Sequence, residues 1–98
     1  QMSRKDSPQQ LSEALDRFIS ANKLEKGLDK VNAQKAWENI MGNGVNSYTR
    51  EVRLERGILY VSLSSAVLRE ELSHGKSKIV SMLNEALGKD LVQKVVLR

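Results

Sequence analysis

A change of hydrophobic period within one short stretch constrains the fold of this chain more than any other feature. Apolar residues first alternate with polar ones, as in a strand with one buried face: Leu59, Val61 and Leu63. After Ser64-Ser65 the spacing becomes helical, with Leu68 and Leu72 on one side. A strand that leads across a serine cap into a helix must lay that helix back on its own sheet. Residues 55–72 therefore predict the centre of a small α+β core.

The predicted strand has a partner immediately before it in the chain. Alternation over residues 47–54 predicts a strand, and Glu55-Arg56-Gly57 predicts a tight turn with glycine at positive φ. A last strand is predicted over residues 92–97. One face of the sheet then packs on the helices, and the other face is expected to bear mainly polar side chains: Thr49, Glu51, Arg53, Tyr60 and Ser62.

The first half of the chain predicts two helices joined by a charged connector. Pro8 suits a first helical turn, and an apolar stripe follows at helical spacing: Leu11, Ala14, Leu15, Phe18 and Ile19. We expect this helix to end near Asn22 and residues 23–30 to form the connector. A second helix is expected from about Asp29, with Gly42 placed to end it. Its apolar face comprises Ala33, Ala36, Trp37, Ile40 and Met41.

A further helix is predicted over residues 65–87, where Gly88 ends it. His74-Gly75 interrupts the apolar spacing by one turn. A glycine inside a helix costs about 1 kcal/mol relative to alanine, and nothing else in residues 73–77 breaks a helix, so one continuous helix is favoured over two. The predicted order is therefore α-α-β-β-α-β, an α+β fold in which a small three-stranded sheet has helices packed on one face. Residues 1–7 are expected to form a disordered tail and residues 8–98 a single domain.

The inventory of reactive side chains argues against an enzyme. The chain has no cysteine and one histidine, His74, so neither a catalytic triad nor a usual zinc site can be assembled within it. Glu70 and Glu71 are adjacent on a helix and point about 100° apart, which excludes a catalytic carboxylate pair. No metal or other cofactor is therefore expected. The polar N-terminus and the absence of an apolar run of roughly 20 residues favour a cytoplasmic protein without a membrane partner.

The basic residues form the one functional constellation. The chain has 16 basic and 12 acidic residues, a net charge of +4, and the excess lies mainly in its second half. This charge permits binding to a polyanion, although an ordinary solvated surface would look the same. The candidate nucleic-acid-binding residues are Arg50, Arg53, Arg56, Arg69, Lys76, Lys78, Lys94 and Arg98. Among the aromatic residues, Trp37 is expected in the core and Tyr60 is the better candidate for an exposed ring.

Several short motifs, taken together in their order and spacing, resemble the DciA-like family. They are Trp37-Glu38-Asn39-Ile40-Met41-Gly42, Thr49, Gly57-x-Leu59-x-Val61, Ser64-Ser65, Leu72, Leu83-Asn84, Leu87-Gly88 and Val95-x-Leu97-Arg98. The resemblance covers residues 31–98, about two-thirds of the chain. It implies a KH-like fold without the GxxG loop, since Gly75-Lys76-Ser77-Lys78 lacks the second glycine.

The resemblance also implies a function. The best-known members of this family bind the DnaB-type replicative helicase of bacteria, assist its loading on DNA, and bind DNA themselves. We therefore expect a non-enzymatic adaptor of DNA replication whose partners are the helicase and single-stranded or fork DNA. Two alternatives stay open, an RNA-binding KH-like module and a protein-interaction domain with no nucleic-acid role.

Overall fold

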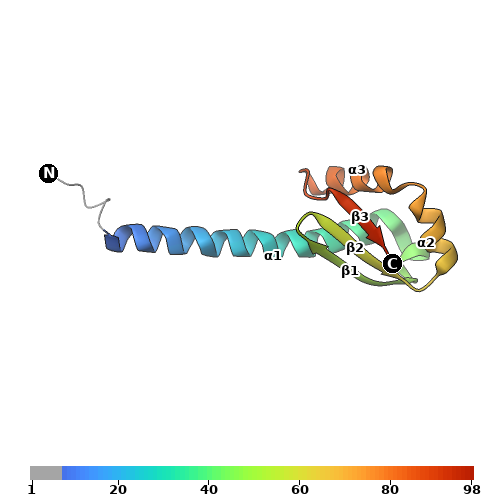
Figure 1. Ribbon diagram of the computed structural model, residues 1–98, viewed down its shortest axis with the longest axis horizontal. Coiled ribbons are helices and arrows are strands. Elements are labelled where there is room, and N and C mark those ends of the chain that lie inside the picture. The colour runs from blue at the N-terminus through green and yellow to red at the C-terminus, as the bar shows by residue number, and fades with distance from the viewer. Residues whose placement is uncertain (1–7) are drawn as a thin grey trace.

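The computed structural model describes residues 8–98, and the predicted tail over residues 1–7 lies outside this range. A long helix, α1, leads into a small sheet that carries two shorter helices (Figure 1). The elements are α1 (Pro8–Asn46), β1 (Thr49–Glu55), β2 (Ile58–Leu63), α2 (Ala66–Ser73), α3 (Lys76–Leu87) and β3 (Lys94–Leu97). The predicted α+β class and three-stranded sheet are confirmed, whereas the division of the helices differs from the prediction in two places.

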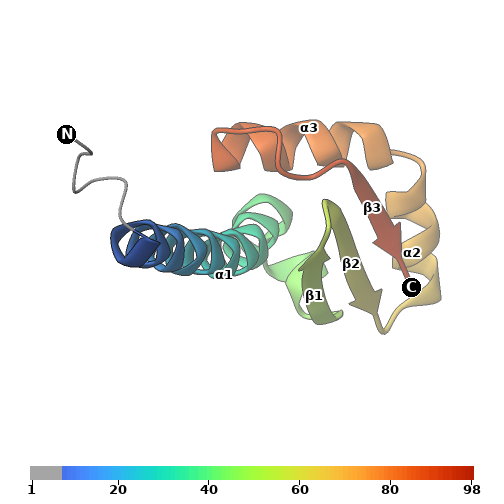
Figure 2. The same ribbon diagram turned by 60° about the vertical axis from the view of Figure 1, so that its left-hand side comes forward.

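The three strands lie in the order β1-β2-β3 (Figure 2). β1 and β2 are antiparallel and joined by the predicted turn, in which Arg56 has φ 51° and Gly57 has φ 81°. β3 runs parallel to β2, with Leu59 opposite Val95. Because side chains alternate across a strand, this register divides the sheet cleanly into two faces. The helices pack against the face that carries Leu59, and the C-terminal part of α1 passes behind the sheet in Figure 1.

The core forms where α1 and α3 meet this inner face. Its largest fully buried side chains are Trp37, Leu59, Val61, Leu83, Val92 and Val95. The Trp37 ring is completely buried, as predicted, and its Nε1–H donates to Thr49 Oγ1 at 3.3 Å. The Thr49 hydroxyl in turn donates to the carbonyl of Val45 at 2.9 Å. The indole therefore enters the core with its one polar group satisfied.

A β-bulge in β1 places Thr49 on the inner face. Thr49 pairs with Leu63 and Glu51 pairs with Ser62, so Arg50 is the extra residue between them. The prediction that Thr49 lies on the outer face with Glu51 and Arg53 is therefore wrong. The extra residue reverses the alternation at this point, and the reversal supplies the hydrogen-bond acceptor that Trp37 needs.

The predicted connector over residues 23–30 is wrong, because α1 continues through it without interruption. Most residues of this segment are lysine, leucine and glutamate, which have high helix propensity, and one glycine does not outweigh them. Two ion pairs then join the segment to the rest of the domain, Lys89–Asp29 at 2.7 Å and Lys30–Glu55 at 3.6 Å. The predicted stop at Gly42 is a kink, with φ 73° and ψ −178°, beyond which helical residues extend to Asn46.

The prediction of one helix over residues 65–87 is also wrong, because α2 and α3 are separate helices. Ser65 caps α2 as expected, its Oγ accepting from Leu68 N–H at 3.1 Å. At the other end, the N–H groups of His74 and Gly75 bond to the carbonyls of Glu71 and Leu72, which closes the helix with a tight turn. The interrupted apolar spacing at this point was the signal of two helices.

The last strand begins at Lys94, two residues later than predicted, because the backbone of Val92 bonds to a side chain. Asn84 Oδ1 accepts from Val92 N–H at 2.8 Å, and Asn84 Nδ2 donates to the Val92 carbonyl at 2.7 Å. Gln93 N–H then donates to the Gly57 carbonyl at 2.7 Å. These bonds fix the start of β3 against both α3 and the β1–β2 turn.

Candidate nucleic-acid interface

An aromatic ring with an arginine on each side lies on the outer face of the sheet. The Tyr60 ring on β2 has the Arg98 guanidinium 4.9 Å from its centroid and the Arg53 guanidinium at 5.6 Å. Both distances lie within the range of a cation–π interaction. We call Arg53, Tyr60 and Arg98 the sheet-face cluster.

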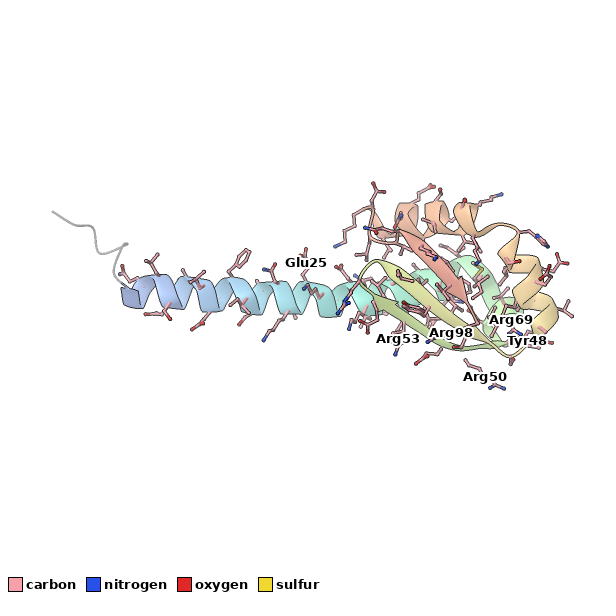
Figure 3. All side chains as sticks on the ribbon, viewed as in Figure 1. Glu25, Tyr48, Arg50, Arg53, Arg69 and Arg98 are labelled. Carbon is pink, nitrogen blue, oxygen red and sulfur yellow. The ribbon has the colours of Figure 1, made fainter. Side chains whose placement is uncertain are left out.

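The register of the sheet brings these three residues together. Arg53 pairs directly with Tyr60 across the hairpin. Arg98 N–H donates to the Val61 carbonyl at 2.9 Å, and the Arg98 carbonyl accepts from Leu63 N–H at 2.8 Å, so the chain continues the ladder past Leu97. Figure 3 shows Arg53 and Arg98 near one another on the sheet. The cluster therefore draws one residue from each of the three sheet segments, all of them held by backbone hydrogen bonds.

The surroundings of the cluster are mixed in charge. Lys94 lies opposite Ile58 at one end of β3 and is exposed, as are both arginines of the cluster, whereas Tyr60 is half-buried. Strand β1 also carries two acidic residues, Glu51 and Glu55. Glu55 forms an ion pair with Lys30. Glu51 lies opposite Ser62. The face is thus basic around the ring without being uniformly basic.

Three of the predicted binding residues, Arg50, Arg56 and Arg69, lie outside the sheet-face cluster. Arg50 is exposed at the bulge, and Figure 3 shows it at the far end of the sheet with Arg69 and Tyr48. Arg56 is exposed at the tip of the hairpin turn. Arg69 on α2 is half-buried, and its Nη1 donates to the Leu63 carbonyl at 3.0 Å. Arg69 therefore ties α2 to the end of β2.

Lys76 and Lys78 form a second basic site at the junction of α2 and α3. Both are exposed and lie in the first turn of α3, which contains no acidic residue. Lys76 lines a shallow open hollow together with Lys94, whereas Lys78 lines a different hollow together with Glu71. Lys94 therefore stands between the helix junction and the sheet face.

The prediction that Tyr60 is the more exposed tyrosine is wrong, because Tyr48 is 50% exposed and Tyr60 is half-buried between two arginines. Sequence reasoning also did not place Tyr60 among the binding residues. The pairing of Arg53 with Tyr60 follows from a two-residue loop between β1 and β2, so the sequence contained a signal for this half of the cluster. The approach of Arg98 depends on the parallel register of β3, which no local pattern specifies.

The described residues offer little for catalysis or for holding a metal. Within residues 8–98 no group of three or more His, Cys, Asp or Glu side chains could hold a metal ion. His74, at the C-terminal cap of α2, lies with its Nε2 3.5 Å from Glu70 Oε1, and both side chains are exposed. The pKa of Lys89 is raised, mainly by its hydrogen bond to Asp29, and this pair joins the loop after α3 to α1. No helix in this part of the chain is long and apolar enough to cross a bilayer.

Comparison with known proteins identifies the family. The family model described as Dna[CI] antecedent, DciA, matches residues 10–97, nearly all of the chain. The chain belongs to the DciA family. Membership of the DciA family implies a helicase-loader-like role in bacterial DNA replication, and the family is not a known enzyme family. A search of the curated proteins finds no match to this chain.

Proposed function

We propose that this DciA-family chain is a nucleic-acid-binding adaptor that acts on the DnaB-type replicative helicase through protein contacts and on single-stranded or fork DNA through its sheet. One observation carries the nucleic-acid part of this proposal, the Tyr60 ring flanked by Arg53 and Arg98 on an outer sheet face. The helicase part is supported by family membership.

The sheet-face cluster has the chemistry that an unpaired strand requires. An aromatic ring on a sheet can stack on an unpaired base, because every base presents a π-face, and this contact contributes about 1–3 kcal/mol per base. The two arginines neighbour the ring, where their guanidinium groups can each contact a backbone phosphate. Bases within a duplex are already stacked, so the cluster favours single strands and the open arms of a fork over duplex DNA.

The basic residues outside the cluster extend this surface. Lys94 lies between the sheet-face cluster and Lys76, so a strand that crosses Tyr60 can continue towards the α2–α3 junction. We include Lys76 and Lys78 in the interface as phosphate contacts, and we place Arg50, Arg56 and Arg69 at its margins. Each phosphate contact to a single strand lowers the slope of log affinity against log salt by about 0.7.

Binding of labelled oligonucleotides tests the proposal directly. Single-stranded DNA, fork DNA, duplex DNA and RNA of equal length are titrated with the protein by fluorescence anisotropy at several salt concentrations. We expect the single strand and the fork to bind more tightly than the duplex, with affinity falling as salt rises. A preference for RNA over DNA would support the alternative of an RNA-binding module, and no binding at low salt would leave only a protein-interaction domain.

A second experiment tests the helicase. The purified replicative helicase of the same bacterium is captured on beads and incubated with this chain, with and without a fork substrate. We expect the chain to be retained in both cases. Retention by an unrelated hexameric helicase to the same extent, or no retention at all, would contradict the adaptor function while leaving the nucleic-acid site untouched.

Reversal of Lys76 and Lys78 to glutamate tests the extension of the site to the helix junction. Both side chains are exposed, so the melting temperature should change little. We expect weaker binding to single-stranded DNA and a shallower salt slope. Unchanged affinity would restrict the interface to the sheet face.

A further inference from the structure

The N-terminal part of α1 exposes an unusual amount of apolar surface. Of the ten large apolar side chains that are exposed within the described residues, seven lie on this part of the helix: Leu11, Leu15, Phe18, Ile19, Leu24, Leu28 and Val31. Phe18 is 64% exposed and Leu24 is 67% exposed. We call residues 11–28 the free segment, because the ion pairs of Asp29 and Lys30 follow it and burial against the sheet begins at Ala33. Large apolar side chains exposed in this number on one helix indicate contact with another protein.

The spacing within the free segment is that of a coiled-coil seam. Residues at alternating intervals of three and four lie along one side of the helix: Leu11, Ala14, Phe18, Ala21, Glu25 and Leu28. Five of these six are apolar, and Leu15 and Leu24 flank the seam. Figure 1 shows this part of α1 projecting beyond the sheet and the other two helices. The seam is therefore accessible over its whole length.

We propose that the free segment pairs with the same segment of a second copy of this chain as an antiparallel two-helix coiled coil. The two-fold axis passes between Ile19 and Ser20. Leu11 then packs opposite Leu28 of the second copy, and Phe18 packs opposite Ala21 of the second copy. The two leucines therefore pack on each other, and the Phe18 ring packs on an alanine that leaves room for it, as coiled-coil layers require.

Glu25, the one polar residue of the seam, favours the antiparallel arrangement over a parallel one. In a parallel dimer in register, Glu25 would face Glu25 of the second copy, and two carboxylates would be forced together. In the antiparallel register Glu25 faces Ala14 instead, so its methylene groups cover the alanine and its carboxylate reaches solvent. Figure 3 shows Glu25 projecting outward from the part of α1 that extends beyond the sheet.

The net charges of the two ends of the free segment also oppose each other. Residues 11–19 carry two acidic side chains and one basic one, whereas residues 20–28 carry two basic side chains and one acidic one. An antiparallel pair places the acidic end of one helix beside the basic end of the other, which is favourable within the screening distance of about 8–10 Å. The same arrangement sends the two sheet domains to opposite ends, where they do not collide.

The length of the seam sets the expected strength of the dimer. The free segment spans 18 residues, or about 27 Å of helix. Two helices in contact over that distance bury on the order of 1,000 Å² in total, at the lower end of specific interfaces. We therefore expect a dimer with a dissociation constant in about the micromolar range, populated at high protein concentration and dissociated on dilution.

Cysteine cross-linking tests the register, because the natural chain contains no cysteine. Ala14→Cys and Glu25→Cys proteins are prepared separately, mixed in reducing buffer and then oxidised. The antiparallel register places these two positions in one layer, within the Cα separation of about 4.4–6.8 Å that a disulfide needs. In the same register, position 14 lies about 16 Å along the axis from position 14 of the second copy.

The mixture should therefore cross-link efficiently, and neither variant should cross-link alone above the level of Lys23→Cys. Lys23 lies away from the seam and measures random collision. Cross-linking of each variant with itself would show a parallel dimer and overturn the proposal. No cross-link in the mixture above the collision control would overturn it as well.

Sedimentation equilibrium over a range of concentrations tests the dimer without any cysteine. We expect a monomer–dimer equilibrium for the natural chain, loss of the dimer in Phe18→Glu, and about tenfold tighter association in Glu25→Leu. Val67→Glu is the matched control, because Val67 is 75% exposed on α2, outside the seam. Circular dichroism and thermal melting show whether each variant keeps its fold. A natural chain that stays monomeric at every concentration, or a Phe18→Glu variant that dimerises equally well, would contradict the proposal.

Discussion

The two faces of the sheet use neighbouring residues of the same strand for opposite purposes. Along β2, Leu59, Val61 and Leu63 are at most 5% exposed and pack into the core, whereas Tyr60 between them turns outward to two arginines. The inner face depends on close packing, in which the loss of a few atoms is costly. The outer face depends on side chains that keep contact with solvent. Substitutions on the inner face should therefore change stability, and substitutions on the outer face should change binding.

The largest effect is expected from Trp37→Ala. The ring is fully buried at the centre of the inner-face core, so its removal leaves a cavity and should lower the free energy of unfolding by about 3–5 kcal/mol. Urea denaturation followed by circular dichroism measures this change. A loss below about 1 kcal/mol would show that the ring does not support the sheet, and would make it available for stacking instead.

A smaller loss of stability is expected from Asn84→Ala. This change removes both hydrogen bonds to the backbone of Val92 and leaves its N–H and carbonyl without their partner, at a cost of about 1–3 kcal/mol. The same denaturation experiment measures it, with Ser81→Ala on an exposed turn of α3 as the control. Equal stability of the two variants would mean that Asn84 does not hold the start of β3.

Tyr60→Ser should act mainly on binding. Loss of the ring removes a stacking platform and should weaken affinity for single-stranded DNA by about 1–2 kcal/mol, or roughly five- to thirtyfold. Tyr60→Phe keeps the ring and should bind nearly as well as the natural chain. If the Tyr60→Phe and Tyr60→Ser variants lose the same affinity, the hydroxyl group of Tyr60 rather than its ring makes the contact.

The smallest expected effect concerns the ion pair that joins α1 to the loop after α3. This pair consists of Lys89 and Asp29. The hydrogen bond from Lys89 to Asp29 raises the pKa of Lys89 above the ordinary 10.5, so the folded state holds the lysine proton more tightly than the unfolded chain does. The stabilisation is therefore fully present below pH 10.5 and is lost as pH rises through the folded-state value. Asp29→Asn should melt slightly below the natural chain near neutral pH, and the difference should vanish at strongly alkaline pH. A difference that persists there would have another cause.

The sequence predicted the inner face better than the outer one. Alternation along β2 and the Arg56-Gly57 turn were sufficient to assign the core residues and the hairpin, because burial imposes a period that can be counted. The face of Thr49 was missed, since a one-residue bulge leaves no mark on the pattern. The sheet-face cluster was predicted only in part, because Arg98 reaches Tyr60 through the parallel pairing of β3.

The helices show a second reason for the errors. The continuous α1 was missed because the charged residues and Gly27 within residues 23–30 suggested a connector, yet the lysine, leucine and glutamate residues of this segment have high helix propensity, which one glycine does not outweigh. The break at Gly75 was visible as a gap in the apolar spacing, but the weak cost of glycine in a helix favoured continuity.

The measurement that tests the division between the faces most directly is the binding of single-stranded DNA by the Arg53→Glu/Arg98→Glu double variant. Affinity and its salt dependence are measured by fluorescence anisotropy, and thermal melting of the same samples reports the fold. We predict at least a tenfold loss of affinity, a salt slope that is shallower by about 1 to 1.5, and a melting temperature close to that of the natural chain. Unchanged affinity in a folded double variant would contradict the assignment of the outer face as the nucleic-acid interface.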